Sequence, residues 1–190
     1  ATTPLPLDKH GLKIMSMGFL VPPTQAVIWR GPMVHRALTQ FLSDLDWGVL
    51  DYLVIDLPPG TGDAQLTLTQ TVPLNGSVIV TTPQEVSMID ARKGIEMFKQ
   101  VRVPILGVIE NMSTFTCDHG STYELFGNGG GQALATEIGS PLLGNIPIEA
   151  AVAHGSDTGE PIVLSKVGAA AEAFAAIAQR IISETVSMQD

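Results

Sequence analysis

The chain has 190 residues with a formal net charge of −9 at pH 7, and 45% of the residues are hydrophobic and 15% charged, which fits a globular protein with a sizeable core and argues against a disordered chain. Ten Lys and Arg in total, with no basic run, argue against a nucleic-acid partner, and no apolar stretch reaches the roughly 18 residues of a membrane span. We therefore expect a soluble cytoplasmic protein without a membrane partner, and the lone cysteine, Cys117, fits a reducing compartment because it cannot form an internal disulfide.

Short apolar runs alternate with longer helical patterns along the chain. This alternation is typical of an α/β fold with a mostly parallel sheet and helices on both faces. The expected strands are residues 13–19, 52–57, 77–81, 105–110 and 142–146. The middle three are rich in Val and Ile and should be central, because strands buried on both faces are apolar throughout.

The expected helices carry apolar residues at helical spacing over residues 33–45, 86–101 and 167–186. Two more should begin near Asp63 and near Gln132. The last helix could lie on a membrane surface or pack on the core, and its Ala-rich sequence with few cations predicts core packing. No linker or repeat divides the chain, so residues 1–190 are expected to form a single domain.

The most informative segment begins at Tyr52 and reads YLVIDLPPGTGD, an apolar strand that ends in a carboxylate and is followed by a Pro/Gly turn. Ligands of open α/β sheets bind beyond the carboxyl ends of the strands. There Asp56 could hold Mg²⁺ beside the phosphates of a nucleotide, as a Walker B acid does. Gly60 would let backbone amides approach a γ-phosphate, and Pro58 would stiffen the turn. The alternative is that Asp56 merely caps the helix that begins near Asp63.

A series of segments, in order and spanning about residues 11–162, is similar to the signatures of the Mrp/Nbp35/ApbC family. They are WRGPM at Trp29, DYLVIDLPPGTGD at Asp51, TTPQ at Thr81, ENMS at Glu110, FGNGGG at Phe126, GNIP at Gly144 and DTGEPI at Asp157. Members of this family are deviant-Walker P-loop ATPases that work as homodimers and are thought to pass an iron–sulfur cluster to apoproteins. The resemblance implies the same fold, with ATP and Mg²⁺ as ligands.

The resemblance also implies roles for individual residues. Asp56 would organise Mg²⁺ and water, and Gly60 and Thr61 would sense the γ-phosphate of ATP. Asn111 would hydrogen-bond to the adenine edge, since its side chain offers both a donor and an acceptor, and Pro147 would lie near the same base. For Asn111 the alternative is a turn-forming role.

The chain departs from the family pattern in its phosphate loop. No Gly-Lys-Ser or Gly-Lys-Thr occurs, so the amide cradle and the lysine for the β- and γ-phosphates are missing. The sequence thus looks like a fragment without the N-terminal strand and phosphate loop, which leaves ATP hydrolysis by this chain open. The Gly-rich segment 127–131 is no substitute, because no Lys and Ser/Thr follow it, and a tight turn before a helix is expected there.

A second departure lies at Cys117-Asp118-His119-Gly120, where the family has Cys-x-x-Cys. Thiolates are soft, anionic donors to iron, and His can replace some of them. Cys117 and His119 from each of two subunits could therefore hold a cluster. The alternative is that Cys117 is a relic and His119 a solvated loop residue.

The function that the sequence favours is an ATP-dependent iron–sulfur carrier that delivers clusters to apoproteins. Two alternatives stay open: a regulatory ATPase switch resembling the MinD/ParA branch, and a non-catalytic interaction protein without a phosphate loop. Nucleotide binding separates the last from the others, and iron reconstitution separates the first two.

Overall fold

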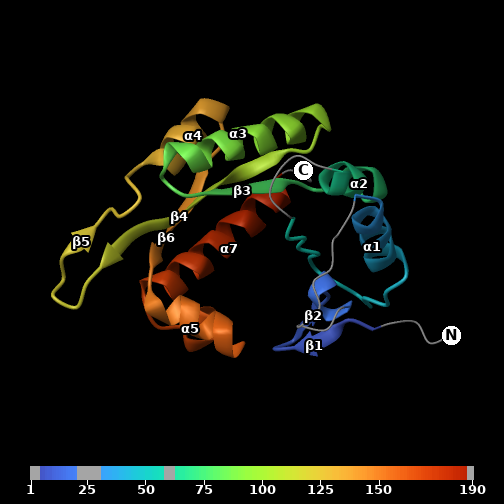
Figure 1. The fold of residues 1–190 in the computed structure, drawn as a ribbon, viewed down its shortest axis with the longest axis horizontal. Coiled ribbons are helices and arrows are strands. Elements are labelled where there is room, and N and C mark those ends of the chain that lie inside the picture. Colours follow the sequence, from blue (N-terminus) through green and yellow to red (C-terminus); the bar gives the residue numbers. More distant parts are fainter. Residues whose placement is uncertain (1–4, 21–30, 58–62, 188–190) are drawn as a thin grey trace. The chain divides into compact units, whose positions relative to one another are not determined.

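The structure is a computed structural model that describes residues 5–20, 31–57 and 63–187. Its ribbon is drawn in Figure 1. The chain divides into two compact units, Ala1–Pro73 and Leu74–Asp190. The single-domain organisation expected from the sequence stays a prediction.

The first unit starts with a hairpin of β1, Leu7–Lys9, and β2, Leu12–Ile14. Its two-residue turn has positive φ at His10 (54°) and Gly11 (76°), as the tight turns that match strand twist require. The predicted strand at 13–19 is wrong in its second half, because a short 3-10 helix covers Met17–Leu20. There the Ser16 hydroxyl accepts the Gly18 N–H at 3.1 Å, a local bond that competes with strand pairing.

Two helices complete the first unit, α1, Gly31–Ser43, and α2, Asp63–Thr71. Both were predicted, α1 with its apolar stripe and α2 with its start at Asp63. They pack together, and the His35 Nδ1 lies 2.7 Å from the Thr67 hydroxyl across the contact. Leu68 is buried at 2% exposure.

The apolar segment 52–57 forms neither helix nor strand, so the predicted strand there is wrong for this structure. Val54 is 88% exposed and Tyr52 51%. A strand is held by backbone hydrogen bonds to a neighbour, and no described segment pairs with these residues. The sequence of this segment has the apolar pattern of a strand, but none of the described strands forms backbone hydrogen bonds with it.

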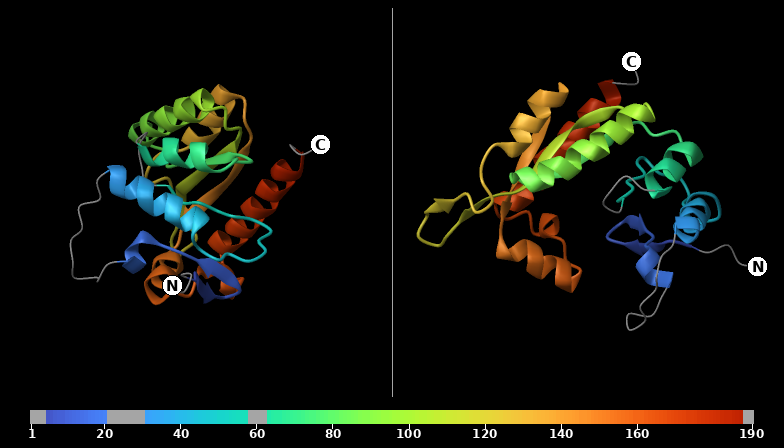
Figure 2. Two further views of the ribbon diagram at one scale, coloured as in Figure 1. Left: turned by 90° about the vertical axis from the view of Figure 1, so that its right-hand side faces the viewer. Right: turned by 45° about the horizontal axis from the view of Figure 1, so that its top comes forward.

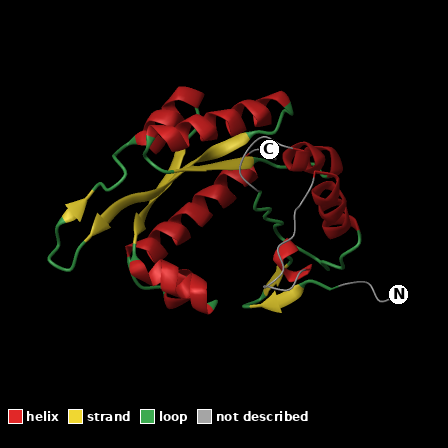
Figure 3. Ribbon diagram, viewed as in Figure 1, coloured by secondary structure: helices red, strands yellow, loops and turns green. Residues whose placement is uncertain are grey.

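A parallel sheet is the centre of the second unit (Figure 3). β3, Ser77–Thr81, and β6, Leu142–Ile148, flank β4, Ile105–Thr116, and both pair with it in parallel. The two-residue β5, Thr122–Tyr123, pairs antiparallel with the far end of β4. The strands predicted at 77–81, 105–110 and 142–146 are therefore confirmed, and β4 and β6 run further than expected.

Helices cover both faces of this sheet, as predicted (Figure 2). α3, Glu85–Gln100, and α4, Gly130–Ile138, lie on one face, and α7, Ala169–Ser187, lies on the other. Neighbouring residues of β4 serve the two cores. Val108 packs with Ile79, Ile95, Leu134 and Ala135, whereas Ile109 packs with Leu143, Ile146 and Ile177.

The C-terminal helix α7 is a core helix, which confirms the prediction. Ala170 and Ile177 are buried, and the Arg180 Nη1 donates to the carbonyl oxygens of Leu142 (3.2 Å) and Leu143 (3.0 Å) in β6. In the part of the chain that the structure describes, no helix is long and apolar enough to cross a membrane. Between β6 and α7 lie two helices that the sequence patterns did not reveal, α5, Ala150–Thr158, and α6, Ile162–Ser165.

Replacing Leu134 by Ala should lower the free energy of unfolding by about 2–5 kcal/mol, because its side chain is fully buried between α4 and the sheet. The matched control is Leu125→Ala, where the side chain is 57% exposed and the change should stay within about 0.5 kcal/mol. Urea unfolding followed by circular dichroism measures both. Equal losses for the two variants would contradict the described core.

Candidate functional site

The carboxyl ends of the parallel strands bring two predicted residues onto neighbouring strands. Asn111 of β4 is the register partner of Ile146 in β6, and Pro147 follows Ile146 directly. Glu110, one residue before Asn111, is the register partner of Asn145. The expected neighbours of an adenine base thus come from adjacent strands at the end of the sheet where ligands of α/β proteins bind.

A pocket of about 330 Å³ opens at this end of the second unit. Its volume is at the lower end of the range for small-molecule sites. Pro147 is part of the lining, whereas Asn111 is not. The lining residues are Glu110, Ser113, Thr114, Thr116, Asn128, Asn145, Pro147, Ala169 and Ala173.

Glu110 is a buried acid, 3% exposed, that holds the start of α4. Its Oε2 accepts the N–H of Gly131 at 2.6 Å, which satisfies one of the unpaired amides at the helix N-terminus. A Cβ on Gly131 would lie 2.7 Å from the Glu110 Cβ, so only glycine allows this approach. Gly127 and Gly129 have φ values of 92° and 71°. This confirms that the Gly-rich segment is a tight turn before a helix.

The strand β4 is irregular at the predicted base contact. The Asn111 Oδ1 accepts the N–H of Met112 at 2.9 Å, and Met112 has a φ of 54°. The register between β4 and β6 shifts between Asn111 and Phe115. Beyond the shift, the Ser113 hydroxyl donates to the Ile146 carbonyl at 3.1 Å and restores the link between the strands. The bond to Met112 leaves the amide N–H groups of Asn111 as the donors for a ligand.

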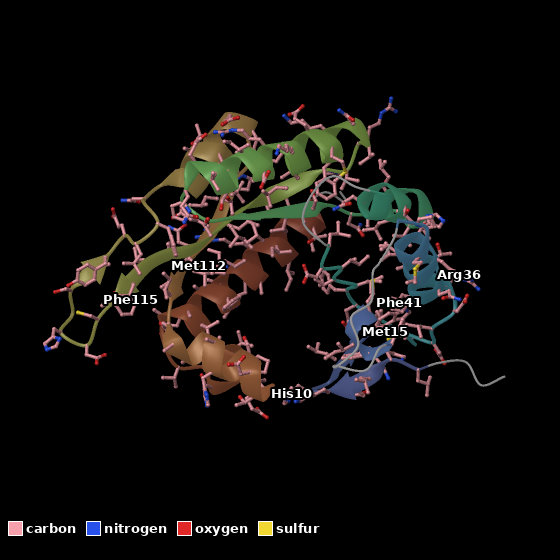
Figure 4. All side chains as sticks on the ribbon, viewed as in Figure 1. His10, Met15, Arg36, Phe41, Met112 and Phe115 are labelled. Carbon is pink, nitrogen blue, oxygen red and sulfur yellow. The ribbon has the colours of Figure 1, made fainter. Side chains whose placement is uncertain are left out.

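Past this irregularity, β4 continues with β5 as an arm that carries Cys117 in its turn. Figure 4 labels Met112 and Phe115 along it, and Figure 2 shows the arm extending beyond the sheet. The Phe115 ring stacks with Tyr123 at a centroid distance of 6.5 Å. The turn is closed by Cys117 N–H to the Ser121 carbonyl (2.9 Å) and Gly120 N–H to the Cys117 carbonyl (2.8 Å).

The turn stabilises the thiolate form of Cys117. The backbone N–H of His119 donates to the sulfur and lowers the pKa of the thiol. Desolvation opposes this, and hydrogen bonds from the Ser121 backbone and side chain add to it. Gly120, at the place of the family's second cysteine, has a φ of 80°, and no atom lies within 4 Å of the position that a Cβ would take there. There is room for a side chain at this position, but the backbone favours glycine.

The two predicted metal ligands, Cys117 and His119, lie in one turn but have no further ligand beside them. Among the described residues, no group of three or more His, Cys, Asp and Glu side chains could hold a metal ion. Cys117 and His119 thus supply two of the four ligands that an iron–sulfur cluster uses.

Three of the four residues predicted to act near the nucleotide phosphates, Pro58, Gly60 and Thr61, lie outside the described residues. Asp56 is described and exposed, and it forms no ion pair with the described residues. An accessible carboxylate of this kind fits a hard cation such as Mg²⁺.

The structure adds Glu110, Ser113 and Asn145 to the predicted set. Their sequence signal was a polar residue at or beyond the end of an apolar strand.

Comparisons with known proteins agree with this fold. The family model described as NUBPL iron-transfer P-loop NTPase, of the ParA group, matches residues 1–182. The iron-sulfur cluster carrier protein of Synechocystis sp. is 53% identical over 186 residues, which are 96% of this chain and 52% of that protein. The iron-sulfur protein required for NADH dehydrogenase, mitochondrial, of Arabidopsis thaliana is 47% identical over 180 residues, 94% of this chain and 58% of that protein. This chain spans about half the length of the curated relatives it matches.

Among solved structures, the nucleotide-binding protein of Archaeoglobus fulgidus in complex with ADP has a TM-score of 0.68 and 38% identity, and the match covers 82% of this chain and 61% of that one. The cell division ATPase MinD of Pyrococcus furiosus has a TM-score of 0.59 and 23% identity, with 83% of this chain and 63% of that one covered. The likeness to MinD concerns the fold alone.

The lowered pKa of Cys117 predicts that its alkylation persists to lower pH than that of a free thiol. Because the thiolate is the nucleophile, the midpoint of the rate against pH should lie below that of N-acetylcysteine measured in parallel. Ser121→Ala removes one hydrogen bond to the sulfur and should move the midpoint upward. Iodoacetamide labelling followed by mass spectrometry gives the rates. A midpoint at or above that of N-acetylcysteine would contradict the described turn.

Proposed function

Because this chain belongs to the ParA family of P-loop NTPases, in the group described as NUBPL iron-transfer proteins, we propose that it acts in the ATP-dependent carriage of iron–sulfur clusters to apoproteins. A homodimer in the cytoplasm binds ATP at the carboxyl end of the sheet and holds the cluster, its cargo, at the Cys117 turn. The observation that carries this proposal is that one strand, β4, bears Asn111 and ends directly before Cys117.

The relatives support both halves of the proposal. Several are named iron-sulfur cluster carrier protein, which supports the cargo. The Archaeoglobus fulgidus neighbour is a nucleotide-binding protein in complex with ADP, which supports the nucleotide. Since this chain spans about half of the carrier proteins, the activity of the whole carrier is part of the proposal.

On the nucleotide side, Asp56 would hold Mg²⁺ and orient the attacking water, and Pro58, Gly60 and Thr61 would respond to the γ-phosphate. Bound Mg²⁺ would neutralise the charge that develops on the phosphates. Asn111 donates its amide N–H groups to the base, and Pro147 lies against it. The sequence has no Gly-Lys-Ser or Gly-Lys-Thr, so phosphate binding by this chain lacks its amide cradle.

On the cargo side, the Cys117 thiolate binds iron, and the His119 N–H that lowers the pKa of this thiol stabilises its anionic form. The His119 side chain is the second donor from the same turn. Two copies of the turn supply two thiolates and two imidazoles, a set that binds iron in Rieske-type centres. In this proposal the four ligands come from two copies of the turn in a homodimer.

One alternative remains from the sequence, a regulatory ATPase switch that uses the same nucleotide site without a cluster. Iron binding at Cys117 separates the two functions. A protein that binds neither iron nor nucleotide would instead be a non-catalytic interaction protein.

Anaerobic reconstitution with iron and sulfide should give a dimer with the visible charge-transfer absorption of thiolate-bound iron. Cys117→Ser should abolish this absorption, because serine is a harder and more basic donor. Asp118→Asn, a change to the exposed neighbouring residue in the same turn, is the matched control and should retain it. Iron retained in full by Cys117→Ser would contradict the assignment of the cargo site.

Gly120→Cys restores the family's paired cysteines and should raise cluster retention, because a second thiolate binds iron better than His119. Nothing lies within 4 Å of the added Cβ, although the φ of 80° places some strain on the new residue. If only the Gly120→Cys dimer holds iron, this protein has lost the carrier function. If neither dimer holds iron, the switch is the better explanation.

The isolated chain should bind Mg-ATP very weakly and hydrolyse none measurably, because it has Asp56 but not the amide cradle and lysine of a phosphate loop. Isothermal titration calorimetry measures the affinity, and phosphate release measures turnover. Micromolar affinity would contradict this prediction and would require a phosphate site elsewhere in the chain.

A further inference from the structure

The part of β4 beyond Asn111 contains a bulge. Asn111 is the register partner of Ile146 in β6, and Phe115 is the register partner of Ile148. Four steps along β4, from 111 to 115, thus match two steps along β6, from 146 to 148, so β4 carries two extra residues there. A bulged strand bends and leaves its extra residues unpaired. The direction in which β4 continues is therefore set within these few residues.

Met112, which lies inside this bulge, has a backbone conformation that few residues with a side chain adopt. Its φ of 54° is in the left-handed region, where the Cβ makes the backbone unfavourable. The Met112 side chain, labelled in Figure 4, is 43% exposed, so its burial does not hold the residue in this conformation. A hydrogen bond contributes instead, because the Met112 N–H donates to the Asn111 Oδ1 at 2.9 Å.

Ser113 fastens the bulge to the neighbouring strand. The residue is 7% exposed, and its hydroxyl donates to the carbonyl oxygen of Ile146 in β6 at 3.1 Å. A buried hydroxyl needs such a partner. Ile146 is the last residue of β6 in register before the shift. The bond from Ser113 therefore ties the extra residues of β4 back to the sheet at the point where regular pairing stops.

The arm beyond the bulge is held together by contacts within itself. Phe115 of β4 is the register partner of Tyr123 in β5, and the two rings stack. These contacts join the two strands of the arm but do not set its direction relative to the sheet. That direction comes from the bulge and from the pairing of Phe115 with Ile148. Since Cys117 follows β4 directly, the place of its thiol relative to the sheet depends on the same direction.

We propose that Met112 and Ser113 are positioning residues for the cargo site, because the bulge that they form sets the direction in which the arm presents Cys117. The proposal rests on the proposed function, in which the Cys117 turns of two subunits share one cluster. A shared set of ligands requires each turn to be held close to its productive geometry. An arm that leaves the sheet in another direction would keep the ligands of its own turn but bring them to the wrong place.

Two substitutions at Met112 separate its backbone conformation from its side-chain chemistry. Asn tolerates the left-handed region, so Met112→Asn should keep the iron bound after anaerobic reconstitution with iron and sulfide. Ile is β-branched and disfavours that region, so Met112→Ile should lower iron retention per dimer at least about fivefold. If Met112 acted through an apolar contact instead, the Ile variant would keep the iron and the Asn variant would lose it. That reversed order would overturn the proposal.

A second set of variants tests the bond from Ser113 to β6. Ser113→Ala removes the hydroxyl and should lower iron retention, whereas Ser113→Thr keeps a hydroxyl and should retain most of the iron. The matched control is Ser156→Ala, which removes a hydroxyl bond of 2.9 Å to the Val152 carbonyl within α5. This control lies outside the arm and should retain the iron in full. The dispersion of the amide NMR spectrum shows that each variant is folded.

Residual dipolar couplings of the ¹⁵N-labelled, iron-free protein measure the direction of the arm separately. Relative to the couplings of β3 and β6, those of Phe115 and Tyr123 should change in Met112→Ile and Ser113→Ala but not in Met112→Asn or Ser156→Ala. Unchanged couplings in the first two variants would overturn the inference, and so would changed couplings with full iron retention. If the couplings change as expected but the unmodified dimer holds no iron, the bulge sets the direction of the arm and the proposed function is wrong.

Discussion

The hydrogen bonds that β4 forms on both of its sides hold the second unit together. In the described residues, β4 pairs in parallel with β3 and with β6, and its successive residues Val108 and Ile109 enter the cores on opposite faces of the sheet. The same strand then continues past the sheet into the arm with β5 and reaches the Cys117 turn. The proposed base site and the proposed cargo turn are therefore joined by a single strand. A change in the backbone near Asn111 can shift the position of Cys117, because both residues lie on the same short stretch of chain.

Burial of Glu110 is the least ordinary feature of this strand. A buried carboxylate is unfavourable unless hydrogen bonds compensate for its lost hydration, and the short bond to Gly131 provides one such compensation. The bond also holds the Gly-rich turn against the sheet and sets one boundary of the pocket. By contrast, Arg92 of α3 joins this helix to α4 through Glu137 and also pairs with Glu85 of its own helix. Exposed ion pairs of this kind contribute little to stability.

The sequence predicted the elements whose hydrophobic pattern is satisfied locally. β3 occupies the predicted residues 77–81, and α3 and α7 follow their apolar stripes. The segment 52–57 has an equally clear strand pattern but forms no strand, because a strand depends on a neighbour that its own sequence does not encode. The helices α5 and α6 were not predicted. The Ala, Gly and Ser residues of α5 give little periodic signal, and the four residues of α6 are too few to show a helical period.

The candidate site was predicted in part for the same reason. Motifs identified Asn111, Pro147 and Cys117, but Asn145 and Glu110 become site residues only through the pairing of β4 with β6, which no local pattern specifies.

Native mass spectrometry of the iron-reconstituted protein is the most direct test of the account as a whole. The account predicts a dimer that carries a single cluster, with monomers free of iron. Iron on the monomer, or a dimer that forms without any cluster after reconstitution, would contradict it.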